Sequence, residues 1–318
     1  MEDPATRAVA GFLESAGLGR ASSIRALSGG VSSDIWRIDL EQGRVCVKRA
    51  LPRLRVAQLW EAPVERNRYE RLWLQTAAAA VPGCAPQVLS WDDAQGLFAM
   101  QYLEYPVWKE RLRSGDVDPA FAGRVGAALA GIHAATAGRS EIAERFPTDD
   151  IFYAIRLEPY LVATGEKHQD LRDKLLSLVE RTASHKIALV HGDVSPKNIL
   201  VSPHGPIFLD AECAWYGDPA FDLAFCLNHL VLKSFWVPNP ALPKCFDALK
   251  DRYLSGVTWE SGIEERVATL LPALLLARVD GKSPVEYLDE AQRQAVRRLA
   301  RKMIQSEEKK LAWPRSST

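Results

Sequence analysis

Two segments in the second half of the chain carry side chains that suit phosphoryl-transfer chemistry. The first is His191-Gly192-Asp193, with Asn198 after four further residues, and the second is Asp210-Ala211-Glu212. A carboxylate at the end of a strand can accept a proton from a hydroxyl group, and amide and carboxylate oxygens suit hard divalent cations. Phosphoryl transfer needs both, because its nucleophile must be oriented and the charge on the transferred group must be neutralised.

A glycine-rich turn near the N-terminus has the composition of a phosphate-binding hairpin. Residues 28–33 read Ser-Gly-Gly-Val-Ser-Ser between two runs of β-like pattern. Glycine lets a backbone approach phosphate closely, and serine adds hydroxyl and amide donors. The sequence therefore predicts phosphate contacts from Gly29, Gly30, Ser32 and Ser33, while a plain hairpin turn remains the alternative.

The hydropathy pattern that must position these segments divides the chain into two parts. Residues 20–103 read as short antiparallel strands with one helix over 63–75, preceded by an opening helix over 4–16. After Glu104 the pattern becomes helical, and three short strands flank the acidic segments, at 187–190, 199–201 and 207–209. The helices predicted for this second part span 121–135, 171–184, 219–232, 243–256, 264–277 and 286–308.

The order of these motifs resembles the kinase-like phosphotransferases of small molecules, the aminoglycoside phosphotransferase and choline kinase superfamily. His191-Gly192-Asp193 to Asn198 is similar to the catalytic loop HGDxxxxN of that family, and Asp210-Ala211-Glu212 stands in the place of its metal-binding motif. The resemblance implies an α+β, protein-kinase-like bilobal fold. Its β-rich, nucleotide-binding N-lobe would span 1–103, its hinge 104–110 and its mainly helical C-lobe 111–318.

The resemblance also implies a role for each catalytic-segment residue. Asp193 would be the catalytic base, or the carboxylate that positions the acceptor hydroxyl, and His191 would support the same loop by hydrogen bonds rather than shuttle protons. Asn198 and Asp210 would bind Mg²⁺, and Glu212 would be a further ligand or a supporting group. ATP is the implied phosphoryl donor, with GTP left open.

On the nucleotide side, Lys48 ends the third predicted strand and is similar to the kinase lysine that contacts the α- and β-phosphates. Its acidic partner on the following helix would be Glu70 or Glu65, of which we favour Glu70. Gln101 and Leu103, just before the hinge, would pair with the adenine edge through their backbones, although an ordinary edge strand has the same pattern.

Local similarity is greatest to methylthioribose kinases, at residues 48–66 and 210–223. Asp222 in the second stretch would support the catalytic loop by accepting backbone N–H groups. The loop itself differs from those enzymes at residues 195–198, which include Asn198, and no paired arginines follow the catalytic segment in an obvious substrate position. We therefore infer kinship with methylthioribose kinases and not a shared substrate.

The acceptor site of this family lies in the helical C-lobe, where the turn at 277–284 concentrates charge. Arg278, Asp280 and Lys282 are candidate contacts for a polar, anionic or sugar-like acceptor, and helix capping explains them equally well. Residues 223–318 contain fifteen Lys and Arg against eleven Asp and Glu. Polycationic acceptors require clustered carboxylates, so this balance disfavours them.

Composition excludes several other classes of protein. Forty Lys and Arg balance forty Asp and Glu, which argues against nucleic-acid and membrane-surface partners. The five cysteines form no zinc or disulfide pattern and are expected as buried thiols. The sequence at 1–7 has no apolar signal segment, so we expect a cytoplasmic protein, and its oligomeric state stays open.

The predicted function is an ATP- and Mg²⁺-dependent phosphotransferase acting on a hydroxyl of a sugar-like metabolite or antibiotic. An aminoglycoside or choline-type kinase is an alternative within the family. A protein kinase is disfavoured, because Gly192 replaces the arginine of its catalytic loop and no Ala-Pro-Glu signature follows Asp210. A nucleotide-binding pseudokinase would require the loss of Asp193, Asn198 or Lys48, and all three are present.

Overall fold

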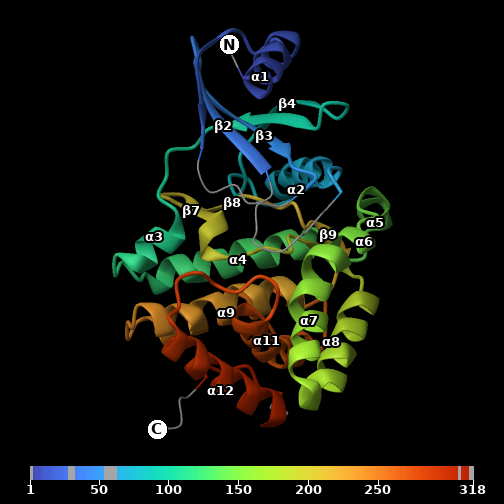
Figure 1. Cartoon of the computed structure of the whole chain (residues 1–318), viewed down its shortest axis with the longest axis vertical. Coiled ribbons are helices and arrows are strands. Elements are labelled where there is room, and N and C mark those ends of the chain that lie inside the picture. Colours follow the sequence, from blue (N-terminus) through green and yellow to red (C-terminus); the bar gives the residue numbers. More distant parts are fainter. Residues whose placement is uncertain (1–2, 28–32, 54–62, 307–308, 315–318) are drawn as a thin grey trace.

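The computed structural model describes residues 3–27, 33–53, 63–306 and 309–314 of the 318-residue chain. A β-rich lobe sits on a larger helical lobe, with the N-terminal helix at the far end of the molecule (Figure 1). The predicted α+β class, with an N-lobe sheet and a helical C-lobe, is confirmed. The exact lobe boundaries at residues 103 and 111 stay a prediction.

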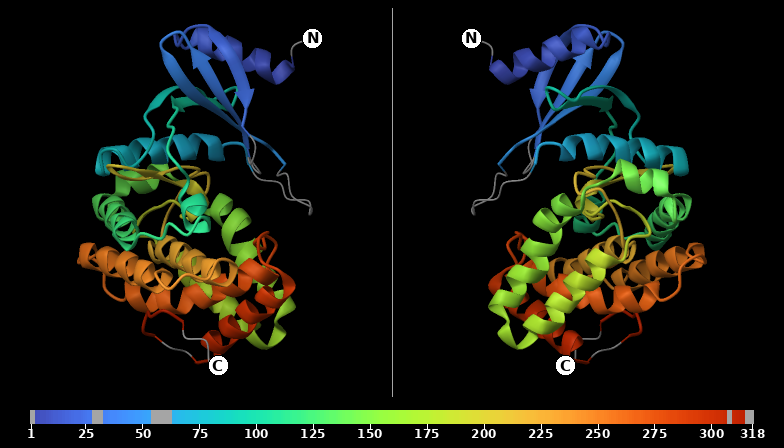
Figure 2. Two further views of the ribbon diagram at one scale, coloured as in Figure 1. Left: turned by 90° about the vertical axis from the view of Figure 1, so that its left-hand side faces the viewer. Right: turned by 90° about the vertical axis from the view of Figure 1, so that its right-hand side faces the viewer.

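The N-lobe is a five-stranded antiparallel sheet in the order β1-β2-β3-β5-β4. Its strands are β1 (Ala21–Ala26), β2 (Ser33–Leu40), β3 (Gly43–Ala50), β4 (Val88–Asp92) and β5 (Leu97–Gln101). Helix α1 (Pro4–Ser15) packs on one face through Val9 and Phe12, and helix α2 (Arg66–Ala80) lies on the other side of the sheet, towards the C-lobe (Figure 2).

The side chains of β3 alternate between the two faces of the sheet, and one lysine points to the face towards the C-lobe. Successive side chains of a strand point to opposite faces. Val47 packs in the cluster beneath α1, whereas Cys46 packs with Trp73 of α2 in the core shared with the C-lobe. Lys48, the next residue after Val47, therefore faces α2 and the C-lobe.

The C-lobe is built of helices around a continuous apolar core. Helix α9 is buried along nearly its whole length, as its apolar composition requires. The helices of the C-lobe are α3 (Trp108–Arg113), α4 (Pro119–Thr136), α5 (Ser140–Arg145), α6 (Asp149–Phe152), the π-helix η1 (Tyr153–Val162), α7 (Ala163–Lys167), α8 (Arg172–Ser184), α9 (Ala220–Trp236), α10 (Leu242–Gly256), α11 (Ile263–Asp280) and α12 (Glu290–Ser306).

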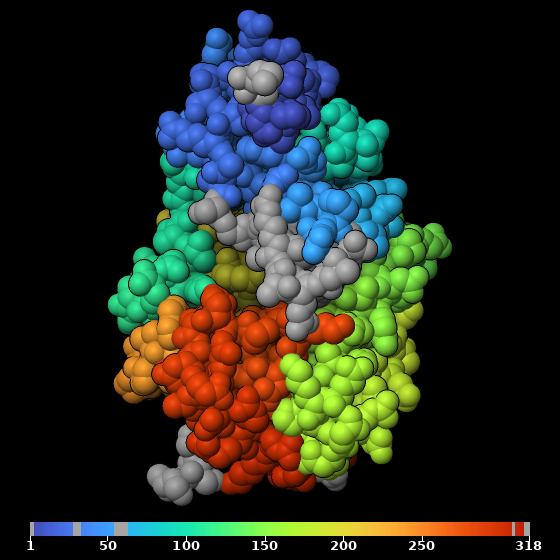
Figure 3. Space-filling view, in the orientation of Figure 1, coloured from blue at the N-terminus to red at the C-terminus, as the bar shows by residue number. Residues whose placement is uncertain are grey.

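Two short antiparallel pairs carry the chemical segments of the C-lobe. Strand β6 (Ala188–Val190) pairs with β9 (Trp215–Gly217), and β7 (Ile199–Ser202) pairs with β8 (Gly205–Phe208). The three predicted strands are confirmed within two residues, and β9 was missed because its three residues lack an alternating pattern. In Figure 3 the olive-coloured atoms of this part of the C-lobe lie recessed beside the green segment that contains α3.

The predicted helices also form, with shifted ends. The helix predicted over 63–75 spans Arg66–Ala80, and the one predicted over 286–308 begins at Glu290. The segment 140–167 was not predicted as helical, and it forms α5, α6, η1 and α7. Pro159 lies inside η1 and has no backbone N–H group to donate, so the sequence at this position argued against a helix.

Other expectations from composition have structural counterparts. All five cysteines are buried free thiols, as predicted. Within the described ranges, we find no helix that combines the length and the apolar composition of a membrane span.

The chain passes from β5 to α3 beside the catalytic segment, where Val201 N donates to the carbonyl oxygen of Pro106 at 2.8 Å.

The contact between α4 and α10 yields a stability prediction. A Cβ atom at Gly126 would lie 2.2 Å from the carbonyl oxygen of Leu249, so the two backbones touch there. We expect Gly126→Ala to lower the free energy of unfolding by about 1–3 kcal/mol, measured by urea denaturation. Gly11→Ala in α1 is the control, because its Cβ would meet nothing within 4 Å. An unchanged midpoint for Gly126→Ala would contradict this packing.

Candidate active site

A buried carboxylate at the start of α9 holds the catalytic loop by its backbone. Asp222 accepts hydrogen bonds from His191 N at 2.7 Å and from Gly192 N at 2.8 Å. His133 Nε2 lies 3.2 Å from the same carboxylate, and its Nδ1 lies 2.8 Å from Tyr253 Oη. The predicted supporting role of Asp222 is confirmed, and the loop conformation is therefore set from within the core of the C-lobe.

The loop needs a glycine at its second position. Gly192 has a φ of 77°, a conformation that L-residues rarely adopt. A Cβ atom there would also lie 2.6 Å from the carbonyl oxygen of Cys213. The backbone of the catalytic loop and that of the segment after Asp210 are thus in direct contact.

His191 uses both ring nitrogens inside the protein. Its Nδ1 accepts from Asp193 N at 3.1 Å, and its Nε2 lies 3.0 Å from the carbonyl oxygen of Leu209. The ring is buried against the edge of Trp73, and this burial lowers the pKa of His191. A neutral ring that accepts at Nδ1 and donates at Nε2 suits the supporting role expected for this residue.

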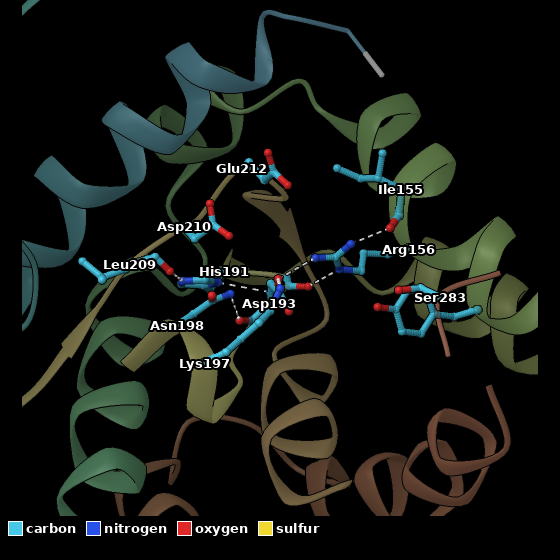
Figure 4. A network of polar contacts seen from close by, with 12 residues as sticks. Ile155, Arg156, His191, Asp193, Lys197, Asn198, Leu209, Asp210, Glu212 and Ser283 are labelled. Atoms are coloured by element: carbon cyan, nitrogen blue, oxygen red, sulfur yellow. Dashed lines mark hydrogen bonds and ion pairs between the residues drawn. The ribbon is translucent and has the colours of Figure 1, made fainter. Parts of the chain in front are cut away.

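The Asp193 carboxylate lies between two cations (Figure 4). Its Oδ2 is 3.1 Å from Arg156 Nη2 and 3.2 Å from Lys197 Nζ. Arg156 Nε also donates to the carbonyl oxygen of Gly192 at 2.5 Å, and Nη1 donates to that of Ile155 at 2.6 Å. Arg156 therefore fixes both the backbone and the carboxylate of the loop.

Sequence reasoning missed Arg156. It lies in η1, 36 residues before Gly192 of the catalytic loop, and only the fold brings it there. Burial opposes its charge, but neighbouring groups that include Cys213 and Asp193 raise its pKa, so it remains cationic. The available signal was a lone arginine within the mostly apolar stretch 151–157.

Asn198 connects the loop to the segment that carries Asp210. Its Nδ2 donates to the carbonyl oxygen of Asp193 at 3.0 Å, which leaves the amide oxygen as the group able to bind a cation. Its own carbonyl oxygen accepts from Leu209 N at 2.9 Å. Asp210, the next residue, adopts a φ of 66°, a left-handed conformation that aspartate tolerates better than most residues.

Lys48 joins the two lobes at this point. Its Nζ lies 2.8 Å from Glu70 Oε1 and also contacts the Asp210 carboxylate. Its side chain is 2% exposed, and although burial opposes its charge, Asp210 and Glu70 raise its pKa. Of the two predicted partners, Glu70 is the one in contact, while Glu65 is exposed.

The carboxylates around Lys48 differ in their surroundings. Burial raises the pKa of Glu70 to about 7, against the opposing effect of Lys48. Burial also acts on Asp210, but Lys48 and Lys197 hold the pKa of Asp210 well below its usual range. Glu212 accepts from Arg66 Nε at 3.1 Å, a contact that suits the supporting alternative expected for it.

The predicted nucleotide contacts are described only in part. Gly29, Gly30 and Ser32 lie outside the described residues. Ser33 begins β2, and its buried hydroxyl has no hydrogen-bond partner among the residues the structure describes.

One backbone group of Gln101 already has a partner inside the protein. Its N–H donates to the carbonyl oxygen of Gln87 at 2.8 Å. The adenine contacts predicted for the backbones of Gln101 and Leu103 stay predictions.

The three predicted acceptor residues lie in different surroundings. Arg278 is buried and donates from Nη1 to Tyr160 Oη at 3.1 Å and to Ser283 Oγ at 2.9 Å. The Tyr160 ring centroid lies 5.6 Å from the guanidinium carbons of both Arg278 and Arg156. Arg278 is thereby connected to the catalytic loop.

Asp280 and Lys282 have other partners. Asp280 accepts from Arg297 Nε at 2.7 Å and lies 2.9 Å from His168 Nε2, so it links α11 to α12. These partners give Asp280 a structural ion pair, and the acceptor contact predicted for it stays a prediction. Lys282 Nζ pairs with Glu158 at 2.5 Å on the exposed surface.

Comparisons with known proteins agree with this geometry. The model of the phosphotransferase enzyme family matches residues 23–264. A methylthioribose kinase of Yersinia pseudotuberculosis serotype O:3 (strain YPIII) is 26% identical over 250 residues, which cover 69% of this chain and 61% of that protein. The chain thus spans less than two thirds of the length of the curated relatives it matches.

Two solved structures share the fold. An amicoumacin kinase in complex with AMP-PNP and Ca²⁺ has a TM-score of 0.61 at 13% identity, covering 93% of this chain and 92% of that one. A choline kinase from Cryptosporidium parvum Iowa II has a TM-score of 0.59 at 10% identity, covering 95% and 96%. The predicted protein-kinase-like bilobal fold is confirmed.

The contacts of Asp222 lead to a second prediction. In Asp222→Asn an amide nitrogen faces one of the loop N–H donors, so a buried donor loses its acceptor. We expect the free energy of unfolding to fall by about 1–3 kcal/mol in urea denaturation. Asp251→Asn on α10, whose side chain is 67% exposed, is the control and should change little. Equal stability of the two variants would refute the role of Asp222 as a loop anchor.

Proposed function

The chain belongs to the phosphotransferase enzyme family, and we propose that it is an ATP- and Mg²⁺-dependent kinase of a hydroxyl group on a small molecule. The observation that carries the proposal is a junction between the lobes. Lys48 of the N-lobe contacts Asp210 of the C-lobe, and the backbone contacts of Asn198 tie Asp210 to the loop of Asp193. An ammonium group, two candidate metal ligands and a candidate base thus converge.

On the donor side, Lys48 binds the α- and β-phosphates of ATP. Glu70 holds the ammonium group from α2, as the contact between Nζ and Oε2 at 2.7 Å indicates. A lysine ammonium is a compact charge with three donors, which suits phosphate oxygens. ATP must compete with Asp210 for this ammonium, so nucleotide binding rearranges the ion pair.

The residues present fit a magnesium ion bound together with nucleotide. No group of three or more His, Cys, Asp or Glu side chains in the described part could hold a metal alone. Mg²⁺ usually takes one or two protein oxygens and completes its shell with phosphates and water. The amide oxygen of Asn198 and the ionised carboxylate of Asp210 provide such oxygens. When bound, the ion neutralises charge on the β- and γ-phosphates.

On the acceptor side, Asp193 orients the hydroxyl group and takes its proton. The hydroxyl oxygen bonds to the γ-phosphorus while the bond from that phosphorus to the β,γ-bridging oxygen breaks and ADP leaves. Arg156 and Lys197 keep the carboxylate in one orientation through the contacts described above. Positioning and charge stabilisation of this kind supply most of the rate in phosphoryl transfer.

The relatives suggest the kind of acceptor without identifying it. Methylthioribose kinases are named for a sugar derivative, and the amicoumacin kinase for an antibiotic. We therefore propose a hydroxylated, sugar-like metabolite or antibiotic as the acceptor. Screening the purified chain with ATP against methylthioribose, aminoglycosides, nucleoside antibiotics, choline and amino sugars, with ADP release as the signal, tests the proposal.

The role of Asp193 gives a third prediction. We expect Asp193→Asn to lower kcat by about 10²–10⁴-fold, since general-base catalysis is lost. The affinity for ATP, measured by calorimetry, should stay within a few-fold, because the carboxylate acts on the acceptor. Asp251→Asn serves again as the exposed control. Turnover of Asp193→Asn close to that of the unmodified chain would remove Asp193 from catalysis.

A fourth prediction concerns the metal. Asp210→Ala should reduce the factor by which Mg²⁺ tightens ATP binding, because one of the two proposed protein ligands is lost. Calorimetric titrations of ATP with and without Mg²⁺ provide this factor for the variant and for the unmodified chain. An equal Mg²⁺ effect in both proteins would rule out Asp210 as a ligand.

A further inference from the structure

A group of buried basic side chains, together with one half-buried tyrosine, lies on α9, α11 and the residues before α12. We call His229, Lys233, Arg278 and Tyr287 the basic cluster. His229, Lys233 and Arg278 are 5%, 2% and 8% exposed, although such groups are seldom buried without a partner. The mechanism proposed above uses none of the four.

The basic cluster contains polar atoms that have no partner. His229 Nε2, Arg278 Nε and Tyr287 Oη are buried and have no hydrogen-bond partner among the residues the structure describes. Buried polar atoms are paired in the large majority of cases, so unpaired atoms on the packed helices α9 and α11 and on the segment after α11 indicate a group that is not part of the chain. All of these atoms can donate, so the missing group is an acceptor of hydrogen bonds.

Charge in the basic cluster is also unbalanced. In the described part of the chain, neither Lys233 nor Arg278 forms an ion pair with a carboxylate. The nearby Glu286 is bound to Lys109, with Nζ and Oε1 2.6 Å apart. Burial, and next to it the charge of Lys109, lower the pKa of Lys233 to about 7. A ligand with negative charge would relieve this penalty.

The basic cluster is connected to the catalytic loop along α9. Phe225, His229 and Lys233 follow one another at four-residue spacing and so share one face of the helix. The Phe225 ring lies 5.7 Å from the guanidinium carbon of Arg156, which contacts Asp193, and its centroid is 5.1 Å from that of His229. Four residues advance a helix by about 6 Å, so His229 lies about one helical turn beyond Phe225, the ring that faces Arg156.

Arg278 approaches the same place from α11. It shares the Tyr160 ring with Arg156, as described above, and its contacts to Ser283 hold Nη1 while Nε stays unpaired. In Figure 4 Ser283 lies on the Arg156 side of the catalytic loop. Helices α9 and α11 therefore present their basic groups to a common region beside the proposed acceptor site.

We propose that the basic cluster binds an oxyanion, a carboxylate or a phosphate, of the acceptor whose hydroxyl group is phosphorylated at Asp193. Imidazole, ammonium, guanidinium and phenol groups are the donors that proteins use for such anions. This inference rests on the proposed function and assigns its substrate class. It excludes polycations such as kanamycin, which would bring further positive charge to Lys233 and Arg278.

The competing explanation is structural. Lys233 Nζ lies 3.4 Å from the Tyr287 ring centroid and 4.3 Å from that of Trp236, and cation–π contacts of this kind can stabilise a fold by themselves. A structural role predicts a loss of stability in Lys233 variants without any effect that depends on the charge of the acceptor.

The first experiment compares acceptors that differ in one charged group. The pairs are gluconate with sorbitol, glycerate with glycerol, and ribose 5-phosphate with ribose, together with kanamycin, assayed for ADP release with ATP and Mg²⁺. We expect kcat/KM for an anionic member to exceed that of its neutral partner at least tenfold. The first two pairs report on a carboxylate and the third on a phosphate. Preference for neutral members or for kanamycin would overturn the oxyanion assignment while leaving the kinase function intact.

The second experiment removes the charge from the protein. Lys233→Met and Arg278→Gln should raise the KM of the preferred anionic acceptor at least tenfold, with kcat and the KM for ATP little changed. Arg278→Glu should raise it further by repulsion. Lys233→Arg should restore much of the affinity, and Lys244→Met, exposed on α10, is the control. An effect equal for anionic and neutral acceptors, or confined to the melting temperature, would establish the structural explanation.

A binding measurement covers the case in which none of these compounds is phosphorylated. The melting temperature is recorded with gluconate, glycerate, ribose 5-phosphate or inorganic phosphate for the unmodified chain and for Lys233→Met. We expect saturable stabilisation of the unmodified chain that the variant lacks. The same response in both proteins would refute the basic cluster as an anion site. Loss of ATP binding, measured separately, would instead count against the kinase function.

Discussion

A buried ammonium group requires counter-ions, and Lys48 obtains them from both lobes. It is almost fully buried, and its neighbours Glu70 and Asp210 come from α2 and from the segment after β8. Breaking a buried ion pair of this kind costs about 3–5 kcal/mol, because it leaves a buried charge without a partner. The pairing therefore determines how the sheet, α2 and the catalytic segment lie relative to one another, and with them the proposed nucleotide site.

Three aspartates of the C-lobe show how partners separate the roles of one residue type. Asp222 is saturated by backbone N–H groups and acts as an anchor. Asp193 is held by two side-chain cations, Arg156 and Lys197, beside the proposed acceptor site. Asp210 contacts Lys48 of the other lobe. The chemistry of a carboxylate here follows from its donors, since the residue type is the same in all three places.

The fold alone does not identify the acceptor of this chain. The solved structures that share the fold include kinases named for two different acceptors, choline and the antibiotic amicoumacin. A shared fold leaves the acceptor undecided, because the acceptor is selected by side chains on helices whose backbone positions are common to the family. The unpaired donors of the basic cluster are therefore more informative about the substrate than the fold.

The sequence by itself determined the features that depend on neighbours along the chain. The spacing from Asp193 to Asn198 and Asp210, the short strands around them and the position of Lys48 at the end of a strand follow from local motifs and strand or helix periodicity. Only the tertiary structure selected Glu70 over Glu65 as the partner of Lys48, placed Arg156 on Asp193 and paired Asp280 with Arg297. These contacts join residues that are 17 or more positions apart, and they depend on how the elements pack, which periodicity along one helix cannot specify.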